Sequence, residues 1–187
     1  MFKVDATING LPPGVLLHNP AAGLMGGNKT GKKPTIPSPE DEAAAGLYWT
    51  EDGSSIAFPS FNIHRAMTAG AAGFKLGKRA MSPYVAGSLV FLPVMASFNT
   101  TDYKIFTCRA VVQRQGIMRS RPNLFPWELS FIIQVAEEDF PNPAIIDESL
   151  KAIMEDTGRR IGIGDFRPAC KGPFGRFQVT KWEVSKI

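Results

Sequence analysis

Apolar residues that recur at every second position, or that follow one another in short runs, predict the strands of this chain. In Phe2–Ile8 (FKVDATI) apolar and polar side chains alternate, which is typical of a strand with one buried face. Trp127–Val135 (WELSFIIQV) and Phe174–Val184 (FGRFQVTKWEV) predict two more strands, and Val85–Phe98 is extended and apolar. A shorter strand is expected at Ser54–Phe58, just before a proline.

Two segments have the features of longer helices. Phe61–Leu76 follows Ser60, a good N-cap residue, and its apolar positions form a stripe that glycines weaken. Pro143–Thr157 begins with proline, carries acids in its first turns and is followed by glycine at 158. A short helix is also predicted at Glu40–Trp49, where acids precede a run of alanines.

The order of the longer elements is strand, helix, strand, strand, helix, strand. This order is that of the split βαβ unit, in which two helices cover one face of a four-stranded sheet. The sequence therefore predicts an α+β fold with a ferredoxin-like, RNA-recognition-motif-like βαββαβ core. In many proteins with this core the free face of the sheet binds single-stranded nucleic acid.

Three segments do not belong to this core. Residues 19–39 are rich in glycine and proline and are expected to form a mobile basic loop, and residues 99–126 an inserted, arginine-rich long β-hairpin. Residues 158–174 form a glycine-rich loop. With these insertions, residues 1–187 are expected to form a single domain. The stretch GGNKTGKK at 26–33 nearly fits a phosphate-binding P-loop, but Pro34 stands where its helix should begin, which favours a basic loop.

Composition excludes several classes of protein. With 44% hydrophobic residues in 187, the chain is long enough for one packed core. Two cysteines, Cys108 and Cys170, exclude a disulfide framework and a four-thiolate zinc site. The first ten residues carry no apolar signal core, and the longest apolar run, Val85–Ala96, is too short for a bilayer. We therefore expect no membrane association and a cytoplasmic location, the host cytoplasm if the chain is phage-encoded.

Charges are segregated along the chain although the net charge is only +4. Acids crowd between Glu137 and Asp156, whereas Tyr103–Trp127 contains arginines and lysine but no acid. The segment 159–176 is basic again, with Asp165 as its one acid. Such segregation indicates one face for a polyanion and another that faces solvent or a neighbour. Because a protomer with unlike charges on separate faces can stack head to tail, we also expect self-association into a filament or ring.

No catalytic constellation is evident in the sequence. The histidines, His18 and His64, have no acidic or cysteine partner at ligand spacing, and no serine stands in a GxSxG elbow. Asp165 could hold a metal or attack a backbone, but a Gly-Asp-Phe turn explains it better. We therefore expect no enzymatic activity, no metal and no cofactor.

The residues expected to contact nucleic acid combine cations, which bind phosphates, with rings on which bases stack. Most lie in the arginine-rich hairpin and in the segment RRIGIGDFRPACKGPFGRF, whose glycines allow another backbone to approach closely. The candidates are Lys29, Lys32, Lys33, His64, Arg65, Arg109, Arg114, Arg119, Arg121, Arg159, Arg160, Phe166, Arg167, Lys171, Phe174 and Arg176.

The same C-terminal segment carries a family resemblance. A helix followed by GIGDFRP…KGPFGRFQV and the last strand resembles the glycine-rich loop of the repeat-associated mysterious protein (RAMP) superfamily, which includes the backbone subunits of CRISPR effector complexes. Ile56–Gly70 resembles that superfamily's element of proline, small residues and helix after a short strand. Residues 165–168 interrupt the usual run of glycines. The GDFRP…GPFGRF ending is also similar to that of small uncharacterised proteins of tailed phages.

The resemblance implies a non-enzymatic protein that binds single-stranded RNA or DNA, with RNA favoured, and that multimerises along the strand. In this reading the loop around 29–33 would reach towards a neighbour, as a thumb does. The alternative is a phage protein that inhibits or replaces a subunit of a host CRISPR effector complex. CRISPR effector subunits would then be its partners.

Overall fold

The computed structural model describes residues 1–21, 37–112 and 115–187, and it contains one four-stranded antiparallel sheet covered by helices. The strands of this sheet are β1 (Phe2–Gly10), β6 (Leu89–Leu92), β10 (Glu128–Val135) and β11 (Phe177–Lys186). They lie in the order β11-β1-β10-β6, and each pair is antiparallel. Numbered within the core this order is 4-1-3-2, so the prediction of an α+β, ferredoxin-like core is confirmed.

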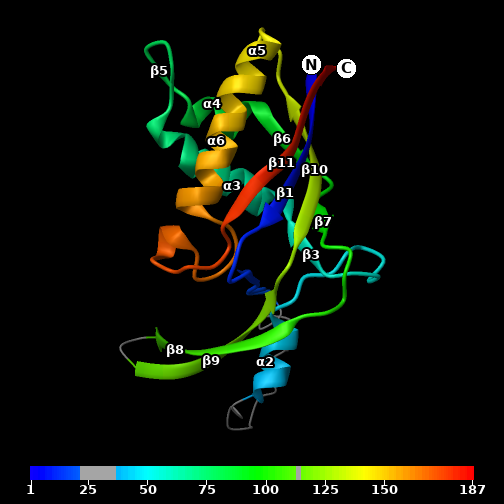
Figure 1. Ribbon diagram of the computed structural model, residues 1–187, viewed down its shortest axis with the longest axis vertical. Helices are drawn as coiled ribbons and strands as arrows, with labels where there is room; N and C mark the ends of the chain where they lie inside the picture. Colours follow the sequence, from blue (N-terminus) through cyan, green and yellow to red (C-terminus); the bar gives the residue numbers. More distant parts are fainter. Residues whose placement is uncertain (22–36, 113–114) are drawn as a thin grey trace.

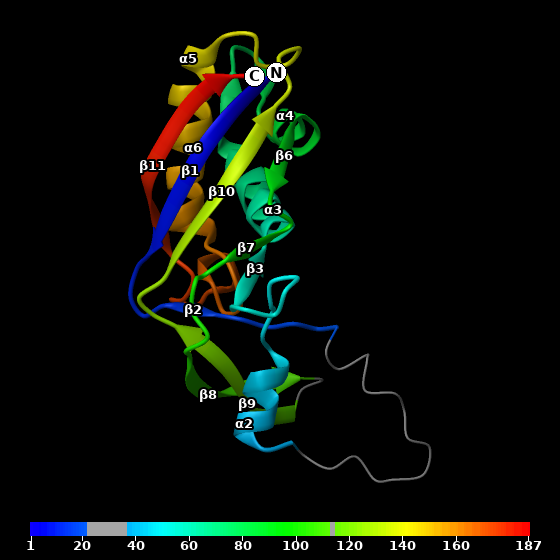
Figure 2. The same ribbon diagram turned by 90° about the vertical axis from the view of Figure 1, so that its right-hand side faces the viewer.

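The alternation of apolar and polar side chains in β1 and β10 decides which face of the sheet is buried. Phe2, Val4, Ala6 and Ile8 are buried, and in the adjacent strand every second residue from Leu129 to Val135 is buried as well. The registers pair Val4 with Ile133 and Ala6 with Phe131, so the apolar side chains of both strands point to the same side. Figure 2 shows the helices on that side and the other face of the sheet uncovered.

Two helices form most of the covering layer (Figure 1). The first is α3 (Ser60–Gly70), followed by a 3-10 turn, η1 (Ala71–Gly73). It is shorter than predicted, and Ser60 is its first residue rather than its N-cap: the buried hydroxyl donates a hydrogen bond of 2.5 Å to the carbonyl of Pro93.

The second helix runs without a break from Pro143 to Ile161. It consists of α5 (Pro143–Ile145), a π-helical turn η2 (Ile146–Leu150), α6 (Lys151–Asp156) and a second π-helical turn η3 (Thr157–Ile161). The prediction that it ends before Gly158 is wrong. Gly158 lies inside the helix, and glycine is required there because a side chain would collide with the carbonyl and ring of Phe177. The helix ends at Ile161, and Gly162, with a φ of 69°, is its C-cap.

The run predicted to be extended from Val85 to Phe98 is only partly so. It begins inside α4 (Ser82–Ser88), a short helix with proline in its first turn, and continues as β6 and then β7 (Met95–Ser97), which pairs with β3 (Ala57–Pro59). Between α3 and α4 the chain makes a small hairpin, β4 (Lys75–Leu76) and β5 (Arg79–Ala80).

The remaining elements form an extension at one end of the sheet. A long hairpin of β8 (Lys104–Val112) and β9 (Gln115–Leu124) pairs with β2 (Val15–Leu16), and α2 (Pro39–Ala45) lies against the hairpin (Figure 1). The last described pair of the hairpin is Val112 with Gln115, so Gln115 begins the returning strand. Ser38 caps α2 by accepting a hydrogen bond from the Asp41 N–H at 3.1 Å.

Candidate nucleic-acid interface

The glycine-rich loop between helix Pro143–Ile161 and β11 is fixed by backbone hydrogen bonds to the start of the chain. The N–H of Asp165 donates to the carbonyl of Leu16 at 2.8 Å, and the N–H of Gly175 donates to the carbonyl of Gly14 at 2.7 Å. Within the loop the N–H of Ile163 donates to the carbonyl of Gly175 at 2.9 Å. A side chain at Gly175, where φ is 71°, would collide with the Ile163 carbonyl, so these close contacts depend on glycine.

Phe166 projects from this loop with an unusual backbone conformation. Its φ is +47°, which is rare for a bulky residue, and its side chain is 42% exposed. The conformation is held by the Asp165 carboxylate, which accepts a hydrogen bond from the Phe166 N–H at 2.9 Å. The Phe166 ring packs on Phe174, which packs in turn on Phe106 of β8, with centroid distances of 6.2 Å and 4.8 Å. Phe166 therefore presents a supported aromatic ring to solvent.

Phe174 was expected to stack on a base, but it cannot do so in this structure. Its side chain is only 4% exposed, because it lies between the rings of Phe166 and Phe106. Its part is to support Phe166.

A groove of about 670 Å³ lies between the glycine-rich loop, the segment after β2 and one face of α3. The α3 residues that line it, among them Phe61, Arg65 and Ala69, recur every three or four positions and so share one face of the helix. Asp165 and Arg167 line the opposite wall. Phe61, at the start of α3, is 53% exposed, so the groove combines an accessible ring with cationic side chains.

The cations of the groove and of the glycine-rich loop differ in how far they already pair with other residues. Arg65, Lys171 and Arg176 are exposed and form no ion pair with any described residue. Arg167 donates a hydrogen bond to the Gly164 carbonyl at 3.0 Å, while its Nε is buried without a partner. At the end of the groove, partial burial and the nearby Arg121 lower the pKa of His18 below its ordinary value.

Of the three described arginines of the long hairpin, Arg119 and Arg121 are engaged inside the protein, and Arg109 is exposed. Glu42 of α2 accepts hydrogen bonds from Arg119 at 2.9 Å, from the Ser120 N–H at 2.9 Å and from Arg121 at 3.4 Å. Arg121 also donates to Asp165 at 3.0 Å. These bonds join α2, the hairpin and the glycine-rich loop into one network, and Arg121 is only 14% exposed within it.

Glu42 was not among the residues singled out from the sequence. Although its partial burial opposes ionisation, the hydrogen bond from Ser120 and the Arg119 guanidinium hold the pKa of Glu42 below its usual value. The sequence signal at this position, an acid in the first turn of a helix, does not indicate a partner so distant in the sequence.

The other predicted contact residues are distributed over several places. His64 is half-buried: its Nε2 lies 2.9 Å from the Val85 carbonyl and its ring packs on Phe91, so it is a packing residue. Arg159 and Arg160 both bind Asp156 but remain 77% and 53% exposed. Arg109 is exposed near the end of β8. Lys29, Lys32, Lys33 and Arg114 lie outside the described residues.

The uncovered face of the sheet does not resemble the aromatic platform of an RNA-recognition motif. In β1 and β11 its described side chains are polar or charged, and several pair with a neighbour: Thr7 with Ser130 at 3.0 Å, Lys3 with Asp5 at 3.0 Å and Lys181 with Glu183 at 3.1 Å. Towards the other edge the face is aliphatic, with Ile132 of β10 and Val90 and Leu92 of β6. Because none of the outward residues described in β1, β10 and β11 is aromatic, stacking of bases on this face has no support.

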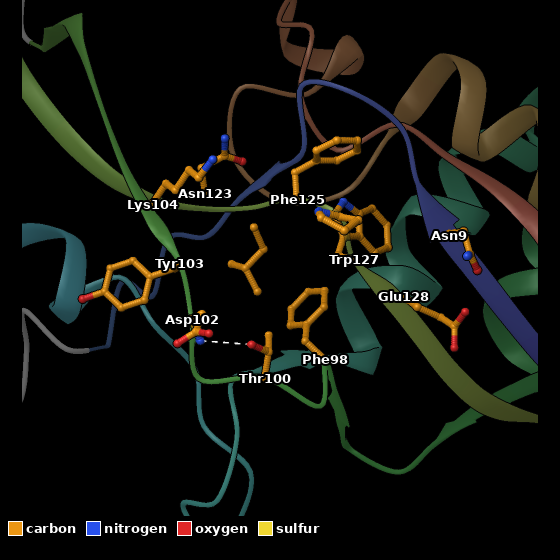
Figure 3. A pocket seen from close by; sticks show the side chains of 12 residues that line it. Asn9, Phe98, Thr100, Asp102, Tyr103, Lys104, Asn123, Phe125, Trp127 and Glu128 are labelled. Atoms are coloured by element: carbon orange, nitrogen blue, oxygen red, sulfur yellow. Dashed lines mark hydrogen bonds between the residues drawn. The ribbon is translucent and has the colours of Figure 1, made fainter.

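A second cavity, of about 570 Å³, lies where the hairpin joins the sheet (Figure 3). Phe98, Phe125 and Trp127 form its apolar wall, and the charged residues around it are Asp102, Lys104 and Glu128. With two carboxylates and one ammonium group, this cavity fits a phosphate backbone less well than the groove along α3 does.

The described residues contain neither a metal-binding cluster nor a membrane-spanning helix. Within residues 1–21, 37–112 and 115–187, no three His, Cys, Asp or Glu side chains are grouped so that they could hold a metal ion. None of the helices in these ranges has the length and apolar composition needed to cross a membrane.

Comparison with known proteins shows a similarity in structure but none in sequence. No protein-family model matches the sequence, and no curated protein matches it either. Among solved structures, the chain is similar to a chain in the cryo-EM structure of the Type III-B Cmr-beta bound to cognate target RNA, with a TM-score of 0.61 and 14% sequence identity. The match covers 99% of this chain but only 61% of that one. At this identity, the likeness shows that the two chains share a fold.

Proposed function

We propose that this protein is a RAMP-like protein that binds single-stranded RNA in the groove between α3 and the glycine-rich loop, without catalysing a reaction on it. The observation that carries the proposal is the exposed Phe166 ring, which packs on Phe174 and lies in the loop between Asp165 and Arg167, two residues that line the groove. Arg65 is exposed on the α3 face that lines the groove, and Lys171 and Arg176 are exposed on the glycine-rich loop. A ring for a base next to cations for phosphates is the arrangement that single-strand binding requires.

The structural comparison supports a role of this kind because the similar chain belongs to the Type III-B Cmr-beta structure bound to cognate target RNA. We propose by analogy that this chain binds RNA and associates with subunits of a CRISPR effector complex. Multimerisation along the strand is part of the same proposal. The edge of β8 that faces away from β9 offers unpaired backbone groups to a neighbouring protomer.

Replacement of a subunit in a host CRISPR effector complex, as the phage alternative requires, is the second candidate function. The observation that favours it is that nearly the whole chain matches part of a longer chain in the Type III-B Cmr-beta structure. In that case protein contacts would contribute most of the binding energy, and binding of free RNA would depend only weakly on salt.

The absence of catalysis is a proposal that rests on Asp165, the one acid in the basic loop. Its carboxylate accepts hydrogen bonds from Arg121 at 3.0 Å and from the Phe166 N–H at 2.9 Å. A carboxylate engaged in this way positions the loop and is not free to act as a base on a bound strand.

Fluorescence anisotropy with a labelled single-stranded RNA tests the proposed function. A Phe166→Ala substitution should weaken binding by about 1–3 kcal/mol, the free energy of stacking one base on an aromatic ring. Phe125→Ala is the matched control, since Phe125 is 44% exposed in the other cavity, and it should leave the affinity unchanged. Equal effects of the two substitutions, or no binding by the unmodified protein, would contradict the proposal.

A further inference from the structure

The small hairpin β4–β5 carries a concentrated positive charge that the groove does not include. Lys75, Lys78 and Arg79 are all exposed on its two short strands and its two-residue loop. Gly77 opens that loop with a φ of +61°, a conformation that glycine adopts without strain. Figure 1 shows the hairpin projecting from the helical layer beside α4, far from the long hairpin.

No acid of the surrounding sequence neutralises these cations. Between Asp52 and Asp102 the chain contains no aspartate or glutamate, although it includes α3, the β4–β5 hairpin and α4. None of the three cations forms an ion pair with a described residue, and Arg79 donates only to the Tyr84 hydroxyl, at 3.2 Å. Their charge is therefore available to a partner.

The hairpin follows directly along the chain after the helix whose face lines the groove. The groove follows one face of α3 from Phe61 to Ala69, a rise of about 12 Å at roughly 1.5 Å per residue, and Ile161 lines it as well. The 3-10 turn η1 follows α3, and a Cβ atom at Gly73 in this turn would lie 3.7 Å from Nη2 of Arg160. The guanidinium of Arg160, which pairs with Asp156 but remains 53% exposed, therefore lies beside the turn that leads from α3 to the hairpin.

We propose that the β4–β5 hairpin is a second phosphate-binding site, which binds the backbone of the same RNA strand where that strand leaves the groove. This inference rests on the proposed function. A phosphate backbone suits the hairpin better than a protein surface does, because the hairpin exposes three cations but no large apolar residue. The core of a protein interface is depleted of charged residues and enriched in aromatic side chains.

The test compares the protein with a variant carrying Lys75→Ala, Lys78→Ala and Arg79→Ala. A matched control removes three positive charges from strands β1 and β11 of the sheet: Lys3→Ala, Lys181→Ala and Lys186→Ala. Affinities for oligouridylates of increasing length are measured by anisotropy at several salt concentrations. Three lost phosphate contacts should lower the slope of log K against log salt by about 2, at roughly 0.7 for each contact on a single strand.

Length dependence separates this site from the groove. Short oligouridylates that fill only the groove should bind the protein and the hairpin variant equally, and longer ones should gain affinity only with the protein and the control. Urea unfolding of the hairpin variant verifies its fold, and Lys78→Glu at the loop tip serves as a second variant that keeps the bond between Arg79 and Tyr84.

Each result decides between the two proposals. In one outcome the unmodified protein binds strongly while the hairpin variant and the control show the same salt slope and the same length dependence. That result overturns the second site and leaves the proposal of RNA binding in the groove intact. If the unmodified protein binds no oligouridylate, both proposals fail. If binding of an acidic protein, but not of RNA, is lost in the hairpin variant, the hairpin is a protein-binding surface and the inference is wrong.

Discussion

A substitution of Glu42 tests whether α2 stabilises the long hairpin, because the Glu42 carboxylate accepts hydrogen bonds from three donors of β9. The change is Glu42→Gln, which keeps the shape of the side chain and removes its charge. The side chain is 15% exposed and accepts two hydrogen bonds of 2.9 Å, from Arg119 and from the Ser120 N–H, and one of 3.4 Å, from Arg121.

The expected change in the free energy of unfolding follows from the hydrogen bonds that each donor loses. A hydrogen bond to a charged group contributes about 1.5–3 kcal/mol, but Arg119 is 39% exposed and can be hydrated instead, while Arg121 keeps Asp165. We therefore expect the free energy of unfolding at pH 7 to fall by about 2 kcal/mol. With a urea m-value of roughly 2 kcal/mol per molar, the midpoint should move by about 1 M.

The pH dependence provides an independent check. Because the folded-state pKa of Glu42 is depressed, its ionised form stabilises the folded protein above the unfolded pKa, about 4.5, and this contribution is lost as the pH falls through the folded pKa. The difference between protein and variant should therefore shrink in acid. Glu40→Gln, on the exposed side of the same helix, should change the midpoint by a few tenths of a molar at most. A Glu42 effect no larger than that of Glu40, or one independent of pH, would refute the reasoning.

Three further outcomes are expected. Anisotropy with matched oligonucleotides should show tighter binding of single strands than of duplex, because bases must be accessible to stack on Phe166; equal affinities would count against the groove. Labelled RNA and DNA incubated with magnesium or manganese should remain intact, and cleavage that disappears in Asp165→Ala would overturn the proposal of a non-enzymatic protein. Light scattering should show assembly that a long single strand promotes and high salt weakens, whereas isolated 20.4 kDa protomers on a long strand would contradict self-association.

The core could be predicted because its strands carry strong local patterns. The alternation in Phe2–Ile8 alone determines which side chains of β1 meet the helices, and the order of the elements leaves few topologies. The end of the second helix was harder to predict, since two glycines, Gly158 and Gly162, lie close together near it. Gly158 is required for the close approach of Phe177, and Gly162 for a left-handed backbone. Only tertiary packing distinguishes these two reasons for a glycine.

The short helix α4 was missed for a different reason. Its second half, Val85–Ser88, leads directly into the apolar strand β6 with Ser88 as the only polar residue, so the whole run favours extended structure. The local signal was Pro83, which fits the first turn of a helix and cannot donate to a sheet.

The candidate site depended on long-range contacts that residue types do not reveal. The hairpin arginines were prominent in the sequence because no acid stands near them, yet Glu42 lies 77 residues before Arg119 and Asp165 lies 44 residues after Arg121. Once these acids are placed, Arg121 becomes a buried link, and the charge left for a strand belongs to residues with no described partner, such as Arg65 and Lys171. Segregation of charge along a sequence therefore predicts a basic face only after the structure has shown which cations the fold neutralises.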